Sequence, residues 1–518
     1  MANRNGLTLG HILKYHAFLK PNKTAIVFRE NRYTWKEFNL RTNRLAHALL
    51  DEGVKKGDVV SIWSLNCNQY LELYFACGKI GAIMNAVNFR LSPEEIKRGM
   101  VHSESKLEIV DWFFEQPYSQ IVDGLPSKGK AVPVIGEPTV DNGIPFEEFI
   151  KDRSDSEPAI EIDPEDPVLL QYTSGTTGSP KGALLTHNNF VWDALVSIYH
   201  QEITFDDKIV VGMPFFHCAG LHILTDAALL KGCTIGIVPL WNAEQVCQLI
   251  HREQATHVFV IMPLMSDFMN TVRSGKYDLS SLKIIGTSAA PHSSAMLTEL
   301  LYRSGARNLL FGYGLTEASP SVTSHLTTSS ILQKEGNSIG VPILSSEIRV
   351  VDSKGNDVPK GESGELIVRG PQVFKGYIKD EKTTKQTLKN GWLYTGDLVK
   401  EDEDGHFWFI GRSKDMIKSG GENVFADEVE QSIMKANPEV GEVAVYGKPD
   451  ERWGEAVAAA CLLKPGATLT EEEVISRTKK VLAHYKVPKY VYFVKEFPRT
   501  GSGKVAKHML PELEKQHG

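Results

Sequence analysis

One ten-residue segment of this 518-residue chain gathers more phosphate-binding groups than any other part of it. Residues 173–182 read Thr-Ser-Gly-Thr-Thr-Gly-Ser-Pro-Lys-Gly. Glycine lets the backbone approach a ligand closely, and successive backbone N–H groups in such a loop can converge on an anion. The hydroxyl groups add donors, and Lys181 adds a positive charge suited to phosphate. The segment therefore predicts a polyphosphate-binding loop, with a solvated surface loop as the alternative reading.

The spacing in this loop matches neither common nucleotide fingerprint. A Walker loop needs a glycine, four residues and then Gly-Lys-Ser/Thr, and that spacing does not occur here. The loop is not a dinucleotide fingerprint either. The apolar run at 167–172 predicts a strand that leads directly into it.

A second group of chemically useful residues stands at 313–317, Tyr-Gly-Leu-Thr-Glu. It follows a predicted strand at 308–311, and open α/β sheets bind ligands at the carboxyl ends of their strands. Tyr313 offers an aromatic face for adenine, Thr316 a hydroxyl, and Glu317 a hard oxygen ligand for Mg²⁺. Alone, such a pentapeptide is more often a turn and a helix cap.

The elements that must position these residues alternate between helix and strand, which predicts a largely parallel α/β sheet. We expect helices over 34–53, 68–81 and 220–231, and strands over 59–63, 208–212, 234–238, 257–261 and 283–286. After residue 340 short strands dominate, separated by turn residues, which predicts a small antiparallel β-barrel. Beyond residue 415 the pattern fits a compact α+β domain. We place the domains at 1–411 and 412–518.

Composition restricts the class of protein. Hydrophobic residues make up 42% and charged residues 23%, as in ordinary globular proteins. The net charge of −7 and the lack of a basic block argue against a nucleic-acid partner. No apolar stretch is long enough to span a bilayer, and no apolar signal core opens the chain, so we expect a cytoplasmic protein. The six cysteines lack metal-ligand spacing, which predicts free, mostly buried thiols in a reduced compartment.

Taken in order from residue 173 to residue 504, the motifs resemble those of the adenylate-forming superfamily, which includes acyl-CoA synthetases, adenylation domains and beetle luciferases. The resemblance implies an α/β fold, with a large N-terminal domain of mostly parallel subdomains plus the β-barrel, followed by a small mobile α+β domain. It also implies ATP, Mg²⁺, coenzyme A and a small carboxylic acid as ligands.

The resemblance assigns the nucleotide site residue by residue. It implies that Thr316 contacts the α-phosphate, that Glu317 ligates the metal and that Asp397 accepts bonds from the ribose hydroxyls. Arg412 reaches the ribose and phosphate region. The run of small residues at 286–291 forms one wall of the adenine and acyl pockets, where Thr287 replaces a common glycine. The remaining nucleotide-binding residues that it implies are Thr173, Ser174, Gly175, Thr176, Thr177, Gly178, Lys181, Ser288, Ala289, Ala290, Gly312 and Tyr313.

Three further assignments concern catalysis and movement. His217, within Pro214-Phe-Phe-His-Cys-Ala-Gly220, is placed near the substrate carboxylate and the α-phosphate. Lys504 matches the lysine of the adenylation step, and Lys414 matches the hinge of the C-terminal domain. Gly420 and Gly421 line the tunnel for the thiol once that domain has rotated.

The predicted function is an acid:CoA ligase that forms acyl-AMP and then acyl-CoA. The overall pattern of the sequence resembles that of medium-chain fatty acid ligases and of aryl or alicyclic acid ligases. Amino-acid-activating members of the superfamily that this chain resembles carry an aspartate in this neighbourhood to pair the substrate ammonium. No acidic residue stands between Val211 and Leu224 here, so the resemblance argues against an amino acid. The alternatives are an enzyme that loads a carrier-protein thiol, a luciferase-like oxygenase, or a nucleotide-binding protein with a decayed site. A homodimer stays open.

Overall fold

The computed structural model describes residues 6–140, 142–173, 181–288, 294–326, 338–419, 422–450, 453–500 and 503–517. The chain divides into two compact units, one of Met1–Glu347 with Val368–Leu393 and one of Ile348–Ile367 with Tyr394–Gly518. The β-rich segments at 348–367 and 394–410 thus group with the C-terminal part by compactness. The predicted boundary at residue 411 separates the part of the chain that is expected to rotate, which compactness does not test, so this boundary stays a prediction.

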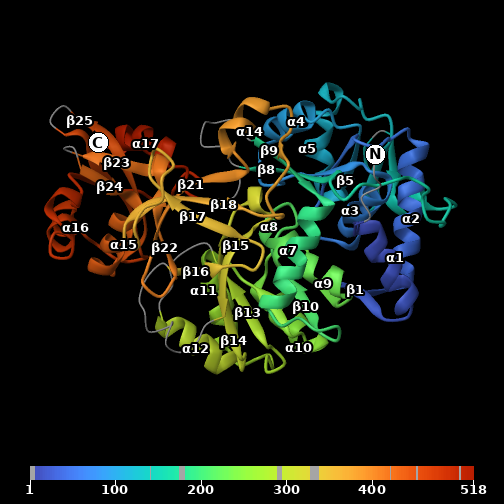
Figure 1. Ribbon diagram of the computed structural model, residues 1–518, viewed down its shortest axis with the longest axis horizontal. Coiled ribbons are helices and arrows are strands. Elements are labelled where there is room, and N and C mark those ends of the chain that lie inside the picture. The colour runs from blue at the N-terminus through green and yellow to red at the C-terminus, as the bar shows by residue number, and fades with distance from the viewer. Residues whose placement is uncertain are drawn as a thin grey trace. The chain divides into compact units, whose positions relative to one another are not determined.

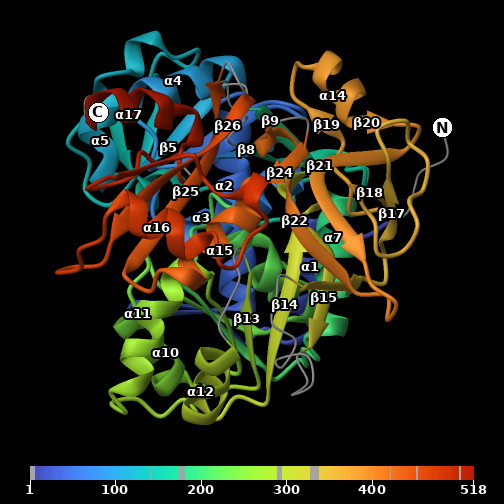
Figure 2. The ribbon, with the colours of Figure 1, turned by 90° about the vertical axis from the view of Figure 1, so that its left-hand side faces the viewer.

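The first unit contains a mainly parallel sheet with the strand order β16-β15-β14-β13-β12-β10-β11-β1-β2. The antiparallel strands β2, β15 and β16 lie at its two ends, and β13, β14 and β15 run side by side (Figure 2). The strands are β1 (Thr24–Phe28), β2 (Asn31–Thr34), β10 (Lys208–Val211), β11 (Thr234–Ile237), β12 (His257–Phe259), β13 (Ile284–Thr287), β14 (Asn308–Gly314), β15 (Ser321–Leu326) and β16 (Ser338–Pro342).

A second sheet of the same unit has the order β19-β9-β8-β4-β3-β5-β6-β7. Its centre is parallel, and β9 and β19 join it in antiparallel pairing. The strands are β3 (Val59–Trp63), β4 (Ile83–Ala86), β5 (Leu107–Asp111), β6 (Val132–Ile135), β7 (Gly143–Pro145), β8 (Pro167–Thr173), β9 (Lys181–Thr186) and β19 (Gly376–Tyr377). All five residues of β3 are buried, as expected for a central parallel strand.

Helices cover these sheets (Figure 1). A buried apolar cluster joins strands β10, β12, β13 and β14 to helices α10 (Ala243–Glu253), α11 (Met262–Arg273) and α12 (Ser294–Ser304). The other helices of the unit are α1 (Leu9–Leu19), α2 (Trp35–Asp51), α3 (Asn68–Ile80), α4 (Pro93–His102), α5 (Glu115–Ser119), α6 (Phe146–Ile150), α7 (His187–His200), α8 (Cys218–Leu221), α9 (Ala227–Lys231) and α14 (Glu381–Thr387).

Local sequence signals fix several of these boundaries. Thr34 and Glu37 form a capping box that starts α2, and Gly81 ends α3 in the left-handed conformation at φ 73°. The predicted helical stretch at 220–231 is helical in the structure, and a π-helical turn over His222–Asp226 lies between α8 and α9. Such turns are rare and frequently occur at functional sites.

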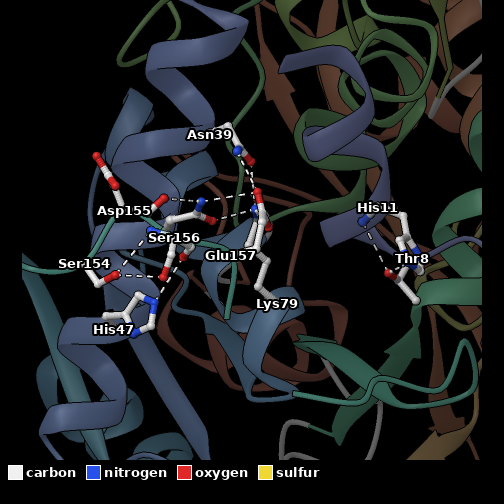
Figure 3. A network of polar contacts seen from close by, with 10 residues as sticks. Thr8, His11, Asn39, His47, Lys79, Ser154, Asp155, Ser156 and Glu157 are labelled. Carbon is white, nitrogen blue, oxygen red and sulfur yellow. Dashed lines mark hydrogen bonds and ion pairs between the residues drawn. The ribbon is translucent and has the colours of Figure 1, made fainter. Parts of the chain in front are cut away.

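A buried lysine ties the segment that leads to β8 against the N-terminal helices (Figure 3). The Nζ atom of Lys79 donates at 2.7 Å to Asn39 Oδ1, to Asn43 Oδ1 and to a carboxylate oxygen of Glu157. The imidazole Nε2 of His47 lies 3.1 Å from the backbone carbonyl of Ser156 in the same segment. These bonds satisfy the buried ammonium and hold the chain in place as it approaches the predicted phosphate loop.

The second unit consists of a β-rich part and an α+β part. Its β-rich part has the strand order β17-β18-β21-β22 (Figure 2). Its α+β part has the order β24-β23-β26-β25, with β27 beside β26. An apolar core joins the α+β strands to α15 and α16. The elements are β17 (Glu347–Val351), β18 (Ser363–Arg369), β21 (Trp392–Glu401), β22 (Phe407–Arg412), β23 (Met416–Ser419), β24 (Glu422–Phe425), α15 (Ala426–Ala436), β25 (Val440–Asp450), β26 (Gly454–Leu463), α16 (Glu471–Thr478), β27 (Tyr490–Phe493) and α17 (Leu510–His517). The short strand β20 (Leu388–Lys389) belongs to the first unit and pairs with the start of β21.

Two sequence-based expectations can be compared with this structure. All six cysteines are free and buried, as predicted. In the part of the chain that the structure describes, no helix combines the length and the apolar character that crossing a membrane requires.

We expect one buried carboxyl to make the stability of the first unit depend on pH. Burial raises the pKa of Asp193, on α7, to about 7. Above about pH 4 the folded protein therefore holds a proton on Asp193 that the unfolded chain releases. The resulting contribution to the free energy of unfolding is full below pH 4 and is lost as pH rises through 7. Between pH 5 and pH 8, the free energy of unfolding should fall by roughly 3 kcal/mol less in the variant Asp193→Asn than in the parent protein. Urea unfolding of both proteins at the two pH values measures this, and equal pH dependence would contradict it.

Candidate active site

The predicted phosphate loop joins the two strands of an antiparallel hairpin. Strands β8 and β9 pair with Thr173 opposite Lys181, and the Thr173 hydroxyl donates to the Lys181 carbonyl at 3.4 Å. The hairpin thus brings both ends of the loop together at the carboxyl end of β8, as a ligand-binding loop requires. Residues 174–178 lie outside the described residues, so their contacts with phosphate stay a prediction.

Strand β14 is longer than the sequence predicts. It continues to Gly314 because β15 pairs with it, placing Tyr313 opposite Thr323. Thr316 and Glu317 follow in a short 3-10 turn, and both are partly buried. A Cβ atom on Gly314 would lie 1.5 Å from the Pro320 carbonyl oxygen, so only glycine fits where the chain folds back. Gly312 and Tyr313 are also partly buried, just before this turn.

Tyr377, which the sequence analysis missed, connects the predicted metal ligand with the phosphate loop. Its hydroxyl donates to Glu317 Oε1 at 2.8 Å, and the Lys181 Nζ lies 5.4 Å from the centre of its ring. The backbone N–H of Phe374 also donates to the Glu317 carbonyl at 2.9 Å. Tyr377 stands 60 residues after Glu317, in a two-residue strand that pairs with β9. No local spacing relates the two residues, so only the folded sheet reveals the contact.

We expect Tyr377→Phe to weaken the use of MgATP. Hydrogen bonds to a charged group contribute about 1.5–3 kcal/mol, so losing one that orients Glu317 should raise the KM for MgATP about tenfold. Titration of both ATP and Mg²⁺ at a fixed acid concentration measures this. Because phenylalanine keeps the ring, the melting temperature should stay nearly unchanged. An unaltered Mg²⁺ dependence would contradict a role for Tyr377 at the metal site.

His217 lies in a tight turn that the backbone defines closely. The His217 N–H donates to the Pro214 carbonyl at 3.1 Å, and the Gly220 N–H donates to the His217 carbonyl at 3.0 Å. The His217 Nδ1 atom accepts a bond from the Ala219 N–H at 3.2 Å. Since Nδ1 is the acceptor, the neutral ring carries its proton on Nε2. This ring is partly exposed within an apolar surround, as a substrate-facing histidine requires.

The structure shows an acidic residue just past the stretch of chain that the sequence analysis found free of acids. Asp226 is fully buried, and its Oδ2 lies 2.6 Å from His222 Nδ1. Burial raises the pKa of the Asp226 carboxyl well above its usual range. Because the carboxyl is fully buried and already bonded to His222, it is not available to pair with a substrate ammonium.

The wall of small residues begins at the end of β13. Thr287 is fully buried and pairs with Phe311 across the sheet, and Ser288, the next residue, is partly exposed. Among the described residues the Thr287 hydroxyl has no hydrogen-bond partner. Ala289 and Ala290 lie outside the described residues, and their place in the acyl pocket stays a prediction.

In the second unit, the two predicted ribose-binding residues form one pair. Asp397 on β21 stands directly opposite Arg412 on β22, and Arg412 Nε lies 3.3 Å from Asp397 Oδ1. The Asp397 side chain is 7% exposed and that of Arg412 40%, so the carboxylate is held while the guanidinium reaches solvent. The pairing places both side chains on one face, a geometry that suits a diol and a phosphate together.

We expect Asp397→Asn to weaken the binding of ATP and AMP about tenfold. The change is nearly isosteric, but it removes the charge and replaces an acceptor oxygen with a donor, and charge-assisted bonds are about twice as strong as neutral ones. Calorimetric titration with AMP, together with the melting temperature, measures this. Asp404→Asn, at an exposed position in the turn between β21 and β22, is the matched control. Unchanged AMP affinity would remove Asp397 from the ribose site.

Lys504 is exposed at the end of a narrow loop. The Thr500 N–H donates to the Lys504 carbonyl at 2.7 Å, and Gly503 adopts a left-handed conformation at φ 84°. Three residues later, the Lys507 Nζ lies 2.7 Å from Glu430 Oε1 on α15, an ion pair that is mostly buried. The loop is thus fixed to the core of the α+β part while Lys504 points outward, as a lysine that reaches a ligand must.

The remaining predictions concern backbone positions. Lys414 occupies the middle of a 3-10 turn, Ser413–Asp415, between β22 and β23. This short turn between two strands is a suitable place for a hinge, and the hinge role stays a prediction. Gly420 and Gly421 lie outside the described residues, so the thiol tunnel is likewise a prediction.

Comparison with known proteins identifies the family. The model for the AMP-binding enzymes matches residues 13–378, and the model for the C-terminal domain of these enzymes matches residues 428–504. The chain belongs to the AMP-binding enzyme family. The predicted adenylate-forming resemblance and the predicted fold class are thereby confirmed.

Individual relatives match over nearly the whole chain. An indoleacetate–CoA ligase of Aromatoleum aromaticum is 34% identical over 508 residues, 98% of each chain. A feruloyl-CoA synthase of Amycolatopsis sp. is 35% identical over 492 residues, 95% of this chain and 96% of the relative. Among solved structures, an anthranilate CoA ligase in complex with anthranoyl-AMP has a TM-score of 0.88 at 26% identity, covering 98% of both chains. An o-succinylbenzoate CoA synthetase of Bacillus subtilis with ATP and magnesium has a TM-score of 0.84 at 27% identity, covering 96% of this chain and 99% of the other.

Proposed function

We propose that this protein is an AMP-forming acid:CoA ligase whose substrate is an aromatic carboxylic acid. In the first step, the acid's carboxylate attacks the α-phosphate of ATP, forming acyl-AMP and releasing pyrophosphate. In the second, the thiol of coenzyme A attacks the acyl carbon, forming the thioester and releasing AMP. The observation that carries the proposal is the match of both family models, the second of which ends at Lys504.

The first half-reaction needs positioning and charge neutralisation rather than covalent help from the protein. Lys181 and the loop that it closes would hold the outer phosphates, and His217 Nε2–H would donate to the carboxylate or to an α-phosphate oxygen. Asp397 and Arg412 would bind the ribose. Lys504 would stabilise the negative charge that the reacting carboxylate and α-phosphate share in the transition state.

The residues of the first unit fit Mg²⁺. Glu317 supplies a carboxylate, the ligand type that this ion prefers, and Tyr377 fixes its orientation from one side. When bound, the ion would neutralise charge on the phosphates. The nearby Lys181 cation adds a second positive charge for the same purpose.

The acid class follows from two supports. The relatives named above act on indoleacetate, ferulate, anthranilate and o-succinylbenzoate, each of which contains an aromatic ring. In this chain, the turn that bears His217 is apolar, with Phe216 in an edge-to-face contact with Phe89 at 4.9 Å. An acid with a flat, uncharged ring suits such a surround better than an amino acid, whose ammonium would be buried without a partner.

A panel of acids tests the proposal. Indoleacetate, ferulate, anthranilate, octanoate and phenylalanine are each incubated with ATP, Mg²⁺ and coenzyme A, and pyrophosphate and thioester are both measured. We expect at least one aromatic acid to exceed octanoate and phenylalanine in kcat/KM. Preference for octanoate would leave the ligase activity in place and overturn the aromatic class. Absence of pyrophosphate release with every acid would contradict the proposed ligase activity itself.

The same assay separates the second candidate, an enzyme that loads a carrier-protein thiol. Such an enzyme would release pyrophosphate and accumulate acyl-AMP without forming a thioester on free coenzyme A. The location in the cytoplasm and the homodimer stay predictions, which fractionation and light scattering would test.

A further inference from the structure

A fully buried polar cluster lies directly behind the turn that bears His217, and the proposed function leaves it unused. It consists of Gln171, His222 and Asp226, none of them more than 2% exposed. His222 and Asp226 are the first and last residues of the π-helical turn, and Gln171 lies on β8. Buried polar groups reduce stability unless they are hydrogen-bonded, so a cluster of this kind needs an explanation.

The three side chains form a continuous chain of hydrogen bonds. Asp226 Oδ2 lies 2.6 Å from His222 Nδ1, and His222 Nε2 lies 3.2 Å from Gln171 Oε1. The Gln171 amide then donates through Nε2 to the Phe216 carbonyl at 3.4 Å. Phe216 immediately precedes His217, and Gln171 stands two residues before Thr173. The chain of bonds therefore joins the histidine turn to the strand that enters the phosphate loop.

The acceptor at the end of this chain determines where the protons are. A backbone carbonyl can only accept, so the Gln171 NH₂ group must face Phe216 and the amide oxygen must face His222. His222 Nε2 therefore carries a proton and donates it to Gln171. Burial lowers the pKa of His222 and raises that of Asp226 well above its usual range, and one proton lies between Asp226 Oδ2 and His222 Nδ1, which are 2.6 Å apart.

The same turn is held from a second side. The Thr225 hydroxyl, also on the π-helical turn, donates to the Gly220 carbonyl at 2.6 Å. A Cβ atom on Gly220 would lie 2.2 Å from the Pro214 carbonyl oxygen, so the turn closes too tightly for any other residue. The turn over 214–220 is thus held at two places, Phe216 and Gly220, on either side of His217. Gly220 is bonded directly to the π-helical turn, and Phe216 is bonded to it through Gln171.

We propose that His222 is a positioning residue for the adenylation step. Through Gln171 it fixes the Phe216 peptide, and with it the direction of His217 relative to the strand that enters the phosphate loop. This inference rests on the proposed function, in which His217 and the phosphate loop act on one substrate carboxylate and one ATP. A displacement of about 1 Å in such a pair can cost on the order of 10² in rate.

Two substitutions distinguish the bonds of His222. In His222→Gln, the amide nitrogen replaces Nε2, so the donor to Gln171 is kept. In His222→Asn, the shorter amide replaces Nδ1, so the contact with Asp226 is kept and the donor to Gln171 is lost. The matched control is His257→Asn, because His257 is an equally buried histidine of the same unit whose Nε2 bonds the Gln201 carbonyl at 3.0 Å.

The experiment measures the kcat and KM of pyrophosphate release and the hydrogen–deuterium exchange of the peptide 212–221. We expect His222→Asn to lower kcat roughly 10–100-fold with little change in the KM for ATP, and to speed exchange in the peptide. We expect His222→Gln to stay within about threefold of the parent on both readouts. The control His257→Asn should lose a similar amount of thermal stability while kcat and exchange in this peptide stay unchanged.

Several results would overturn the inference. Unchanged kcat and unchanged exchange in His222→Asn would show that the cluster only stabilises the fold. Equal loss in His222→Gln would show that the bond to Gln171 is not what matters. If His222→Asn fails to fold, Gln171→Met, which removes the same bond and keeps the side-chain length, must show the same loss. The exchange readout needs no turnover, so it shows whether His222 holds the turn even if the parent protein activates no acid, and the two failures are thereby distinguished.

Discussion

Lys504→Ala should lower the rate of acyl-AMP formation roughly 10²–10³-fold, the usual cost of removing one preorganised electrostatic donor. The lysine is exposed, and the Thr500 N–H donates to its backbone carbonyl next to the left-handed Gly503. Its charge would act on the oxygens that become more negative in the transition state, so kcat should fall more than affinity for ATP.

The two half-reactions provide the internal control for this variant. Thioester formation from supplied acyl-AMP and coenzyme A should fall far less than adenylation, because the lysine is needed only where pyrophosphate leaves. Lys495→Ala, at an exposed lysine of the same unit, should leave both rates unchanged. Equal loss in both half-reactions would contradict the assigned role of Lys504.

Lys414→Pro should block thioester formation while sparing adenylation. Lys414 lies in the 3-10 turn between β22 and β23, where the C-terminal domain is predicted to rotate. Proline fixes φ and also disfavours the helical conformation of the preceding residue, Ser413. A domain that cannot turn would leave the thiol tunnel unformed, and misplaced reacting groups cost on the order of 10² in rate.

The measurement times acyl-AMP accumulation and coenzyme A-dependent AMP release in one preparation. The control is Lys414→Ala, which removes the side chain but leaves the backbone free to rotate, and it should release AMP at nearly the parental rate. If Lys414→Pro also releases AMP at the parental rate, rotation at this residue is not part of the cycle. The predicted boundary at residue 411 would then lose its main support.

Local patterns predicted the elements well where one short-range rule dominates. The strand at 59–63 and the helix at 68–81 are confirmed almost to the residue, because a mostly apolar run and a terminal glycine act locally. The predicted helical stretch at 220–231 is confirmed, but the π-helical turn at its centre was not predicted, since His222 there contacts Gln171, 51 residues away. The end of β14 was placed too early for the same reason, because pairing with β15 lengthens it.

By itself, the sequence determined the family and the fold class and predicted the site residues, because the glycines, hydroxyls and charges of a phosphate loop or an adenylation lysine have to stand in a fixed order along the chain. Only the tertiary structure decided which of them support one another. It paired Asp397 with Arg412 across two strands, placed Tyr377 on Glu317, and joined Gln171 to the turn that bears His217. These contacts link residues 15 to 60 positions apart, and no periodicity encodes them. They depend on strand register and on the burial of polar groups, which exist only once the chain has folded.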